Sequence, residues 1–175
     1  MKEILLLLGF IFIFSALKAQ TRNDVKIYGY IQPVSRGAAP DINIDEAGNV
    51  APKSYKQGSN YFIYISGPAS TRLYPIEMWL KGKQYSAKPE AVNKTPVQMG
   101  DPALRDSHNI ITLVPKTTKK VMMLVPRNTV IQSKSLAIAK SKAKTNELVV
   151  VYKMSGKLYY ALLKELNVLG GASMQ

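Results

Sequence analysis

The chain has one histidine, His108, and it lies near acidic residues that could assist it in acid–base chemistry. Asp101 and Asp106 precede His108, and Ser107 is adjacent to it. A serine hydrolase needs a carboxylate that orients the histidine and a histidine that deprotonates the serine. Side chains at consecutive positions rarely converge in this way, and the sequence has no G-x-S-x-G turn. We therefore interpret this segment as a polar loop that precedes a strand.

Glycoside hydrolysis needs two carboxylates about 5–10 Å apart, and the sequence offers no clear pair. Most acidic residues lie in expected turns, whereas Glu77 lies in the middle of an expected strand. Lys81, or a lysine on a neighbouring strand, is the expected partner of Glu77. A single histidine and the absence of cysteine leave metal catalysis without its usual ligands. We therefore expect no enzymatic activity, no catalytic residues, no bound metal and no cofactor.

Asp41, Asn43 and Asp45 place oxygen ligands at alternate positions, as at the start of a calcium-binding loop. An EF-hand loop also needs glycine at its sixth position and glutamate at its twelfth. Those positions hold Glu46 and Pro52 here. The segment fits a hairpin better, with a turn after Asp45. A looser calcium site formed by Asp41, Asn43, Asp45 and Glu46 is the alternative.

Lysines form the one large electrostatic feature of the sequence. The candidate surface for an anion or a partner comprises Lys116, Lys119, Lys120, Lys134, Lys140, Lys142 and Lys144. A dedicated anion site usually uses arginine, because the guanidinium group binds an oxyanion through two parallel hydrogen bonds. Arg127 is the only arginine in residues 116–175. The pattern therefore indicates a diffuse basic surface rather than a shaped pocket.

The beginning of the chain has the pattern of a secretory signal peptide. A charged start is followed by an apolar run over residues 4–17, and Ala19 provides a small residue at the expected cut. The run is shorter than the roughly 20 residues that a membrane span needs. We therefore predict a signal peptide over residues 1–19, a single domain over residues 20–175, and a periplasmic or secreted location. An uncleaved anchor, with Lys18 at its membrane exit, is the alternative.

Composition and charge limit the classes of partner. The formal net charge is +13 at pH 7, and residues 116–175 hold 11 basic but only 2 acidic side chains. A field of this size attracts anionic surfaces and steers partners. Outside the cytoplasm these are lipid head groups, acidic glycans or acidic proteins rather than nucleic acid. The lack of cysteine excludes disulfides, thiol nucleophiles and the acylation site of a lipoprotein.

Short apolar stretches between turn residues indicate an all-β domain. The expected strands cover residues 24–31, 61–66, 73–81, 109–114, 120–125, 147–152 and 158–163, with a shorter one within 92–99. Such a series of short strands favours an antiparallel β-sandwich, immunoglobulin-like in the broad sense. Pro33 is expected to end the first strand, Pro75 to require a strand edge or a bulge, and residues 86–108 to form a loop.

Two segments are open to more than one interpretation. Residues 133–144 fit either a short helix with its apolar residues on one side or a lysine-rich loop. Residues 159–169 contain helix formers and are followed by two glycines. The Ser-Gly turn that precedes them favours a strand through Leu163 instead, as the second half of a hairpin.

These features favour an exported, non-enzymatic β-sandwich module that binds or scaffolds a component of the cell envelope. The ten tyrosines support this hypothesis, because a rigid amphipathic ring costs little entropy to fix at a binding surface. The alternative is a periplasmic binder of anionic glycans or lipid head groups that uses the basic C-terminal half. We expect an envelope protein or an anionic surface as partner, no nucleic acid, and only peripheral membrane contact unless the signal is uncleaved.

Overall fold

The computed structural model of the 175-residue chain describes most of the sequence after residue 21. Its described residues are 22–36, 43–44, 50–51, 58–100, 110–127, 136–170 and 172–174. The expected signal peptide therefore lies outside the described residues. None of the helices within these ranges is long and apolar enough to cross a membrane.

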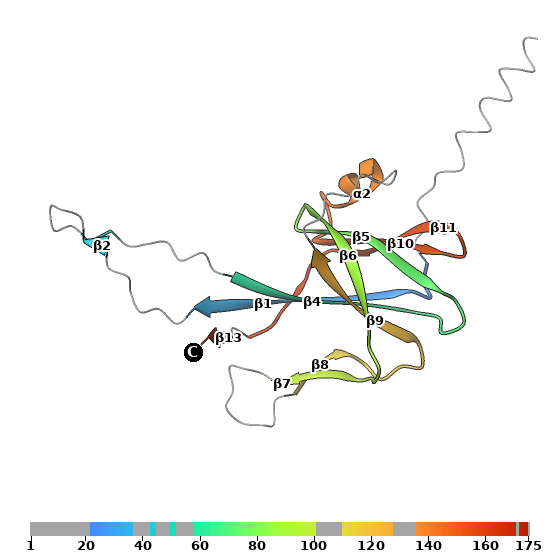
Figure 1. The fold of residues 1–175 in the computed structure, drawn as a ribbon, viewed down its shortest axis with the longest axis horizontal. Coiled ribbons are helices and arrows are strands. Elements are labelled where there is room, and N and C mark those ends of the chain that lie inside the picture. The colour runs from blue at the N-terminus through green and yellow to red at the C-terminus, as the bar shows by residue number, and fades with distance from the viewer. Residues whose placement is uncertain are drawn as a thin grey trace, which may run out of the picture.

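One sheet of nine strands dominates the described part of the chain (Figure 1). Its strands are β1 (Lys26–Arg36), β4 (Gly58–Gly67), β5 (Leu73–Leu80), β6 (Lys83–Ala91), β9 (Lys120–Arg127), β10 (Leu148–Met154), β11 (Lys157–Leu163), β12 (Asn167–Val168) and β13 (Ala172–Met174). Their order is β11-β10-β5-β6-β9-β4-β1-β12, and β13 also pairs with β1. The all-β prediction is confirmed. The predicted two-sheet sandwich is not confirmed, because these strands belong to a single sheet.

The sheet curls on itself as a half-barrel. Six successive antiparallel pairings lead from β11 to β1, so these two strands run in the same direction. After β11 the chain reaches the opposite edge of the sheet, where β12 pairs in parallel with Tyr30 and Ile31 of β1. β13 adds a second parallel pairing, from Val34 to Arg36. The predicted purely antiparallel arrangement is thus corrected to a mixed sheet, in which the C-terminal segment closes part of the curl.

The concave side of the curled sheet holds the main hydrophobic core. Ile63 and Ile65 of β4, Met78 of β5, and Leu148 and Val150 of β10 are fully buried there. Successive side chains of a strand point to opposite faces, so every second residue enters this core. The intervening residues lie on the convex side, where two smaller apolar clusters form.

The helix α2 (Leu136–Lys142) covers one of these convex clusters. Ala139 of the helix is fully buried and packs with Trp79 of β5 and Val149 of β10. The short helix considered for residues 133–144 is therefore present, and it explains why Val149, on the convex side, is as buried as the core itself.

A hairpin of β7 (Val97–Gly100) and β8 (Ile110–Val114) covers the other convex cluster, over β1, β4 and β9. The hydroxyl of Tyr30 donates a 2.7 Å hydrogen bond to the carbonyl of Leu113, which joins this hairpin to β1. The predicted strands at 109–114 and within 92–99 are thus confirmed as a pair.

β1 continues through Pro33, where the sequence predicts an end. Pro33 pairs with Ser59 of β4. The carbonyl of Ile31 accepts a 2.8 Å hydrogen bond from the N–H of Leu169, on the side of the strand that faces β12. Backbone groups two residues apart point to the same side, so the missing N–H of Pro33 also faces away from β4. The proline therefore removes no bond from the β1–β4 pairing.

Prolines also fit into β5 and β6 for identifiable reasons. β6 continues through Pro89, although residues 86–108 are predicted to be a loop. Ser86 is the last residue of β6 that pairs with β5, so Pro89 lies beyond the end of that pairing. Its missing N–H therefore interrupts no hydrogen bond with β5. Opposite Pro75 of β5, the pairing with β10 shifts its register, which confirms the predicted bulge.

Two hairpins turn through two residues with positive φ. Lys81 and Gly82 join β5 to β6 with φ of 47° and 77°, and Ser155 and Gly156 join β10 to β11 with φ of 50° and 77°. Positive φ at both central positions defines a type I′ turn, whose twist matches that of the flanking strands. The hairpin of β10 and β11 is as the sequence predicts.

Candidate functional site

The first half of β1 and the whole of β11 approach each other without pairing. β12 pairs with β1 only at Tyr30 and Ile31, so residues 26–29 have no strand partner on that side within the described ranges. β11 pairs with β10 alone among the described strands. We call the gap between residues 26–29 of β1 and residues 160–163 of β11 the seam.

Backbone groups of both strands point into the seam. In a hairpin with a two-residue turn, the residues that flank the turn bond to each other, and bonding then alternates along the pair. Lys157 flanks the turn and bonds to β10, so Tyr159 and Ala161 also bond to β10. The N–H and C=O groups of Tyr160 and Leu162 therefore point away from β10 and into the seam. Ile27 faces it from β1, because Ile31 bonds on that same side. Unpaired strand edges of this kind are templates for another strand.

A groove of about 320 Å³ follows the seam. Its lining includes Ala161 and Ile27, which belong to the concave core, and Leu162 and Tyr28, which pack with the convex clusters. Side chains from both faces of the sheet thus line one groove. This is the arrangement expected of a space between two strands rather than of a hollow on one face.

Arg22 forms the charged rim of this groove. Its Nη2 and Nε donate hydrogen bonds of 2.7 Å and 2.9 Å to the two carboxylate oxygens of Asp24. These hydrogen bonds hold the pKa of the Asp24 carboxyl below its usual value and raise the pKa of Arg22. The guanidinium carbon also lies 5.7 Å from the ring centroid of Tyr159. Arg22 is therefore held beside the seam by a bidentate ion pair and an aromatic ring.

Three contacts hold the closed end of the seam. Glu147 Oε2 accepts a 2.8 Å hydrogen bond from the N–H of Leu166, and Glu147 Oε1 lies 3.7 Å from Lys81 Nζ. Asn167 Nδ2 donates a 3.4 Å hydrogen bond to the carbonyl of Gly29. The side chain of Leu166 is buried in the concave core. These contacts fix the C-terminal segment across the curl and leave the other end of the seam open.

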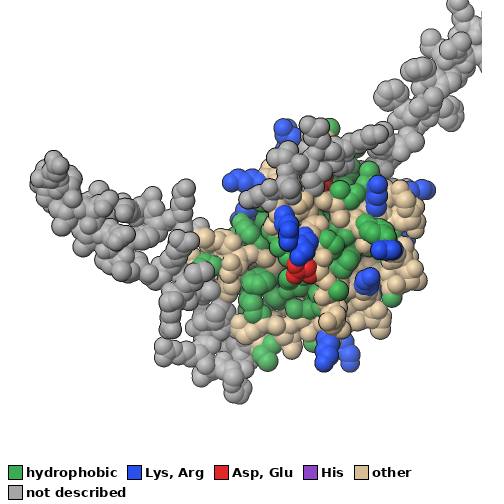
Figure 2. Space-filling model, viewed as in Figure 1, with side chains coloured by type: hydrophobic (Ala, Val, Ile, Leu, Met, Phe, Trp, Pro, Cys, Tyr) green, Lys and Arg blue, Asp and Glu red, His purple; other side chains and the backbone are tan. Residues whose placement is uncertain are grey.

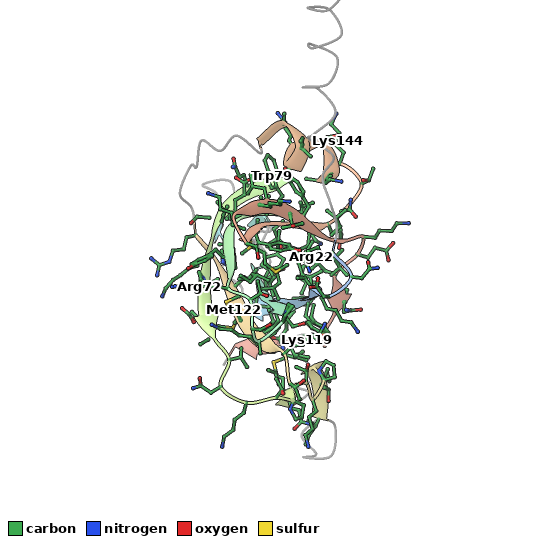
Figure 3. The ribbon with its side chains drawn as sticks, turned by 90° about the vertical axis from the view of Figure 1, so that its right-hand side faces the viewer. Arg22, Arg72, Trp79, Lys119, Met122 and Lys144 are labelled. Atoms are coloured by element: carbon green, nitrogen blue, oxygen red, sulfur yellow. The ribbon has the colours of Figure 1, made fainter. Side chains whose placement is uncertain are left out.

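The predicted lysine surface falls into two regions (Figure 3). The first comprises Lys140, Lys142 and Lys144, on α2 or just after it. The second comprises Lys116, Lys119 and Lys120, at the β8–β9 connection and the start of β9. Lys144 and Lys119 lie on opposite sides of the curled sheet in Figure 3. Lys134 lies outside the described residues.

Two of these lysines have local partners. Lys142 Nζ lies 5.7 Å from the ring centroid of Tyr160, and Lys119 Nζ donates a 2.6 Å hydrogen bond to the carbonyl of Asp24. Figure 2 shows basic side chains spread over the visible face rather than gathered at one place. The structure thus does not bring the six described lysines into one surface.

Glu77 is the catalytic candidate that lies within the described residues, and its side chain is fully buried on the convex side. Gln84 Nε2 donates a 2.9 Å hydrogen bond to Glu77 Oε2. Lys81, an expected partner of Glu77, instead pairs with Glu147, because the type I′ turn carries Lys81 beyond the strand. The other acid–base candidates, Asp101, Asp106 and His108, lie outside the described residues.

No group of three or more histidine, cysteine, aspartate or glutamate side chains that could bind a metal occurs in the part of the chain that the structure describes. Of the calcium candidates, Asn43 alone is described. It belongs to β2 (Asn43–Ile44), which pairs antiparallel with β3 (Val50–Ala51), as the hairpin interpretation predicts. Asp41, Asp45 and Glu46 lie outside the described residues.

Sequence reasoning does not anticipate the seam, because the seam depends on which strands become the edges of the sheet. One local signal points to it. Gly29 interrupts an otherwise alternating strand, and a glycine inside a strand often marks a close approach of another segment. In this protein the approaching side chains are those of Leu163 and Leu166, from the two sides of the closed end.

The seam is thus a gap with two free strand edges, an apolar inner side, and a rim formed by Lys26 and the Arg22–Asp24 ion pair. Comparison with family models, curated proteins and solved structures finds no match for this chain.

Proposed function

We propose that this chain is an exported, non-enzymatic binding module that accepts an extended segment of an envelope protein at the seam. The observation that carries the proposal is the pair of free strand edges, with Ile27 on β1 and Tyr160 and Leu162 on β11. Strand addition obtains affinity from main-chain hydrogen bonds and specificity from the positions of alternate side chains.

The geometry of the seam indicates the direction and composition of the added segment. Because β1 and β11 run in the same direction, one added strand can be antiparallel to both. Its inward side chains would meet Ile27 and Ala161, which favours apolar residues. Its outward side chains would lie beside the exposed Lys26, which favours an acidic residue at that position.

The alternative function, binding of anionic glycans or head groups through the C-terminal lysines, has weaker support. Its lysines divide between two regions of the fold, and two of them have other local partners. A diffuse field of this kind steers an anionic partner without selecting it.

A designed peptide tests the proposal. The probe is a fluorescent peptide of about eight residues, a common strand length, in which valine and aspartate alternate. One control has the same composition in shuffled order, and a second is N-methylated at alternate residues along one edge. Fluorescence anisotropy with the full chain should show binding of the alternating peptide and weak or no binding of both controls. Equal binding of all three peptides would contradict strand addition.

A matched pair of variants locates the binding at β11. Leu162→Pro removes an N–H that points into the seam, whereas Leu162→Ala removes the same side chain and keeps the N–H. We expect the proline variant to lose about fivefold to tenfold in affinity beyond the alanine variant, the effect of one lost hydrogen bond. Circular dichroism checks the fold of both. Should the proline variant not fold, the N-methylated peptide still decides the question.

A further inference from the structure

A second hollow lies on the convex side, away from the seam, where the β4–β5 and β10–β11 turns meet. Its volume is about 480 Å³. Arg72 and Tyr74 contribute from the start of β5, and Lys153 contributes from the end of β10. Tyr74 and Lys153 are direct partners across the two strands, so their side chains lie on the same face.

Arg72 is held in a defined position by an aromatic ring. Its guanidinium carbon lies 4.6 Å from the ring centroid of Tyr74. Stacking uses the face of the guanidinium group and leaves its N–H edges available for a planar, bidentate contact with an oxyanion. Tyr74 itself remains 46% exposed, so this pair is open to a ligand. In Figure 3 Arg72 extends away from the sheet.

The described residues at this hollow carry only positive charge. None of the described residues that line it is acidic, and neither Arg72 nor Lys153 forms an ion pair with a carboxylate of the described chain. Two cationic side chains therefore line the same hollow, and one of them, Arg72, is held by an aromatic ring. A dianion neutralises them with one group, whereas a carboxylate neutralises only one of them.

Further hydrogen-bond donors surround the two cations. Ser70, Thr71 and Ser155, each of which carries a hydroxyl, also line the hollow, together with Gly156 at the tip of the β10–β11 turn. Such a set suits an anion with three terminal oxygens better than one with two. The volume falls within the range of small-molecule sites, about 300–1,000 Å³. It leaves space for an organic group beside the anion.

From this arrangement we infer that the hollow binds the phosphate group of a phosphate monoester. Arg72 and Lys153 bind the phosphate, the turn hydroxyls complete its hydrogen bonds, and Tyr74 positions Arg72. This site goes beyond the proposed strand-addition function and does not depend on it. The hollow combines Lys153 with Arg72, which lies outside residues 116–175. The basic residues of 116–175 therefore do not form this site by themselves.

Two probes distinguish the sources of such a phosphate. Glucose 6-phosphate represents a soluble ligand and is measured by calorimetry. Phosphatidylcholine vesicles with added phosphatidic acid represent a lipid-borne monoester and are measured by sedimentation. Binding of the sugar phosphate assigns a soluble source, and binding of the vesicles alone assigns a lipid source. Failure of the full chain to bind either probe overturns the inference.

A matched pair of double variants separates the site from bulk charge. R72Q/K153Q removes two charges from the hollow, and K83Q/K94Q removes two from exposed positions outside it. We expect at least a tenfold loss of affinity in the first and less than a twofold loss in the second. Equal losses in the two would overturn the inference in favour of general electrostatic attraction.

A third comparison tests the role of Tyr74 as a positioning residue. Tyr74→Ala removes the ring under Arg72 without changing any charge, and Tyr74→Phe keeps the ring. The alanine variant should lose about threefold to tenfold in affinity, as expected for a cation–π contact. The phenylalanine variant should retain wild-type affinity. Unchanged affinity of the alanine variant would contradict this role.

Discussion

A Cβ atom on Gly29 would lie 2.6 Å from Cδ2 of Leu166. The same atom would lie 2.9 Å from Cδ2 of Leu163 and 3.1 Å from Cδ2 of Leu148. The absence of a side chain at Gly29 thus allows three leucines to pack directly on the backbone of β1. This close approach closes one end of the seam, while the strands stay unpaired at the other end.

Gly29→Ala should destabilise the fold by about 1–3 kcal/mol, the usual cost of adding a methyl group to a packed core. Gly58→Ala is the matched control, because a Cβ at Gly58 meets no described residue within 4 Å. Its effect should stay within about 0.5 kcal/mol. Urea unfolding monitored by Trp79 fluorescence measures both. Equal effects of the two substitutions would contradict the close packing at Gly29.

Glu147 should control how firmly the closed end of the seam is held. Glu147→Ala removes the acceptor of the Leu166 N–H and should cost about 1–2 kcal/mol. Amide exchange at Leu166 and Leu169 should accelerate in this variant. Glu147→Gln keeps an acceptor and loses only the 3.7 Å contact with Lys81, a surface ion pair of small value. If the glutamine variant exchanges as fast as the alanine variant, the hydrogen bond to Leu166 is not what holds the segment.

Tyr152 should make the fold sensitive to alkali. Its ring lies 5.7 Å from that of Tyr159, and its buried hydroxyl has no hydrogen-bond partner among the described residues. Burial disfavours the phenolate and raises the pKa of Tyr152 to about 12. Because the unfolded chain ionises first, near pH 10, this stabilising effect is complete below about pH 10 and is lost as the pH rises toward 12.

Tyr152→Phe should therefore reduce the alkaline decline in the free energy of unfolding. At pH 7 the variant should be as stable as the wild type, or more stable by up to about 1 kcal/mol, since it removes a buried group without a partner. Denaturant titrations at pH 8, 10 and 11 measure both effects. An alkaline decline of the same size in the two proteins would show that Tyr152 is not responsible.

Glu77 and Glu90, on neighbouring strands, should contribute very differently to the free energy of unfolding. Glu77 of β5 is fully buried and accepts a hydrogen bond from Gln84, whereas Glu90 of β6 forms an exposed 3.0 Å pair with Lys88. Glu77→Ala should cost about 2–4 kcal/mol, because buried polar partners lose their acceptor. Glu90→Ala should cost less than about 0.5 kcal/mol. Comparable losses in thermal unfolding would contradict a structural role for Glu77.

Local features of the fold could be predicted from the sequence because short-range chemistry determines them. The Ser155–Gly156 turn and the bulge opposite Pro75 follow from the conformational preferences of glycine and proline. The alternation of apolar residues similarly identifies β5, and short continuous apolar runs identify β4 and β10. Even the position of α2 follows from its apolar residues, although propensity alone leaves a loop equally reasonable.

The long-range features could not be predicted, because they depend on pairings between distant segments. The parallel pairing of β12 with β1 joins residues more than 130 positions apart, and the strand order that replaces the expected sandwich with one sheet likewise depends on distant pairings. The same applies to the two candidate sites. Arg72 meets Lys153, and Ile27 faces Leu162, only after the strand order has been established. Pro33 and Pro89 lie within strands because each has its missing N–H on a side where no ladder bond is lost, and that side depends on the strand order.

Amide hydrogen exchange along β11 tests the central claim, that the seam is an open acceptor for a strand. In the free protein, the amides of Tyr160 and Leu162 should exchange much faster than those of Tyr159 and Ala161, which bond to β10. Addition of the alternating peptide should slow exchange at Tyr160, Leu162 and Ile27. Protection of Tyr160 and Leu162 already in the free protein, or no change with saturating peptide, would contradict the account.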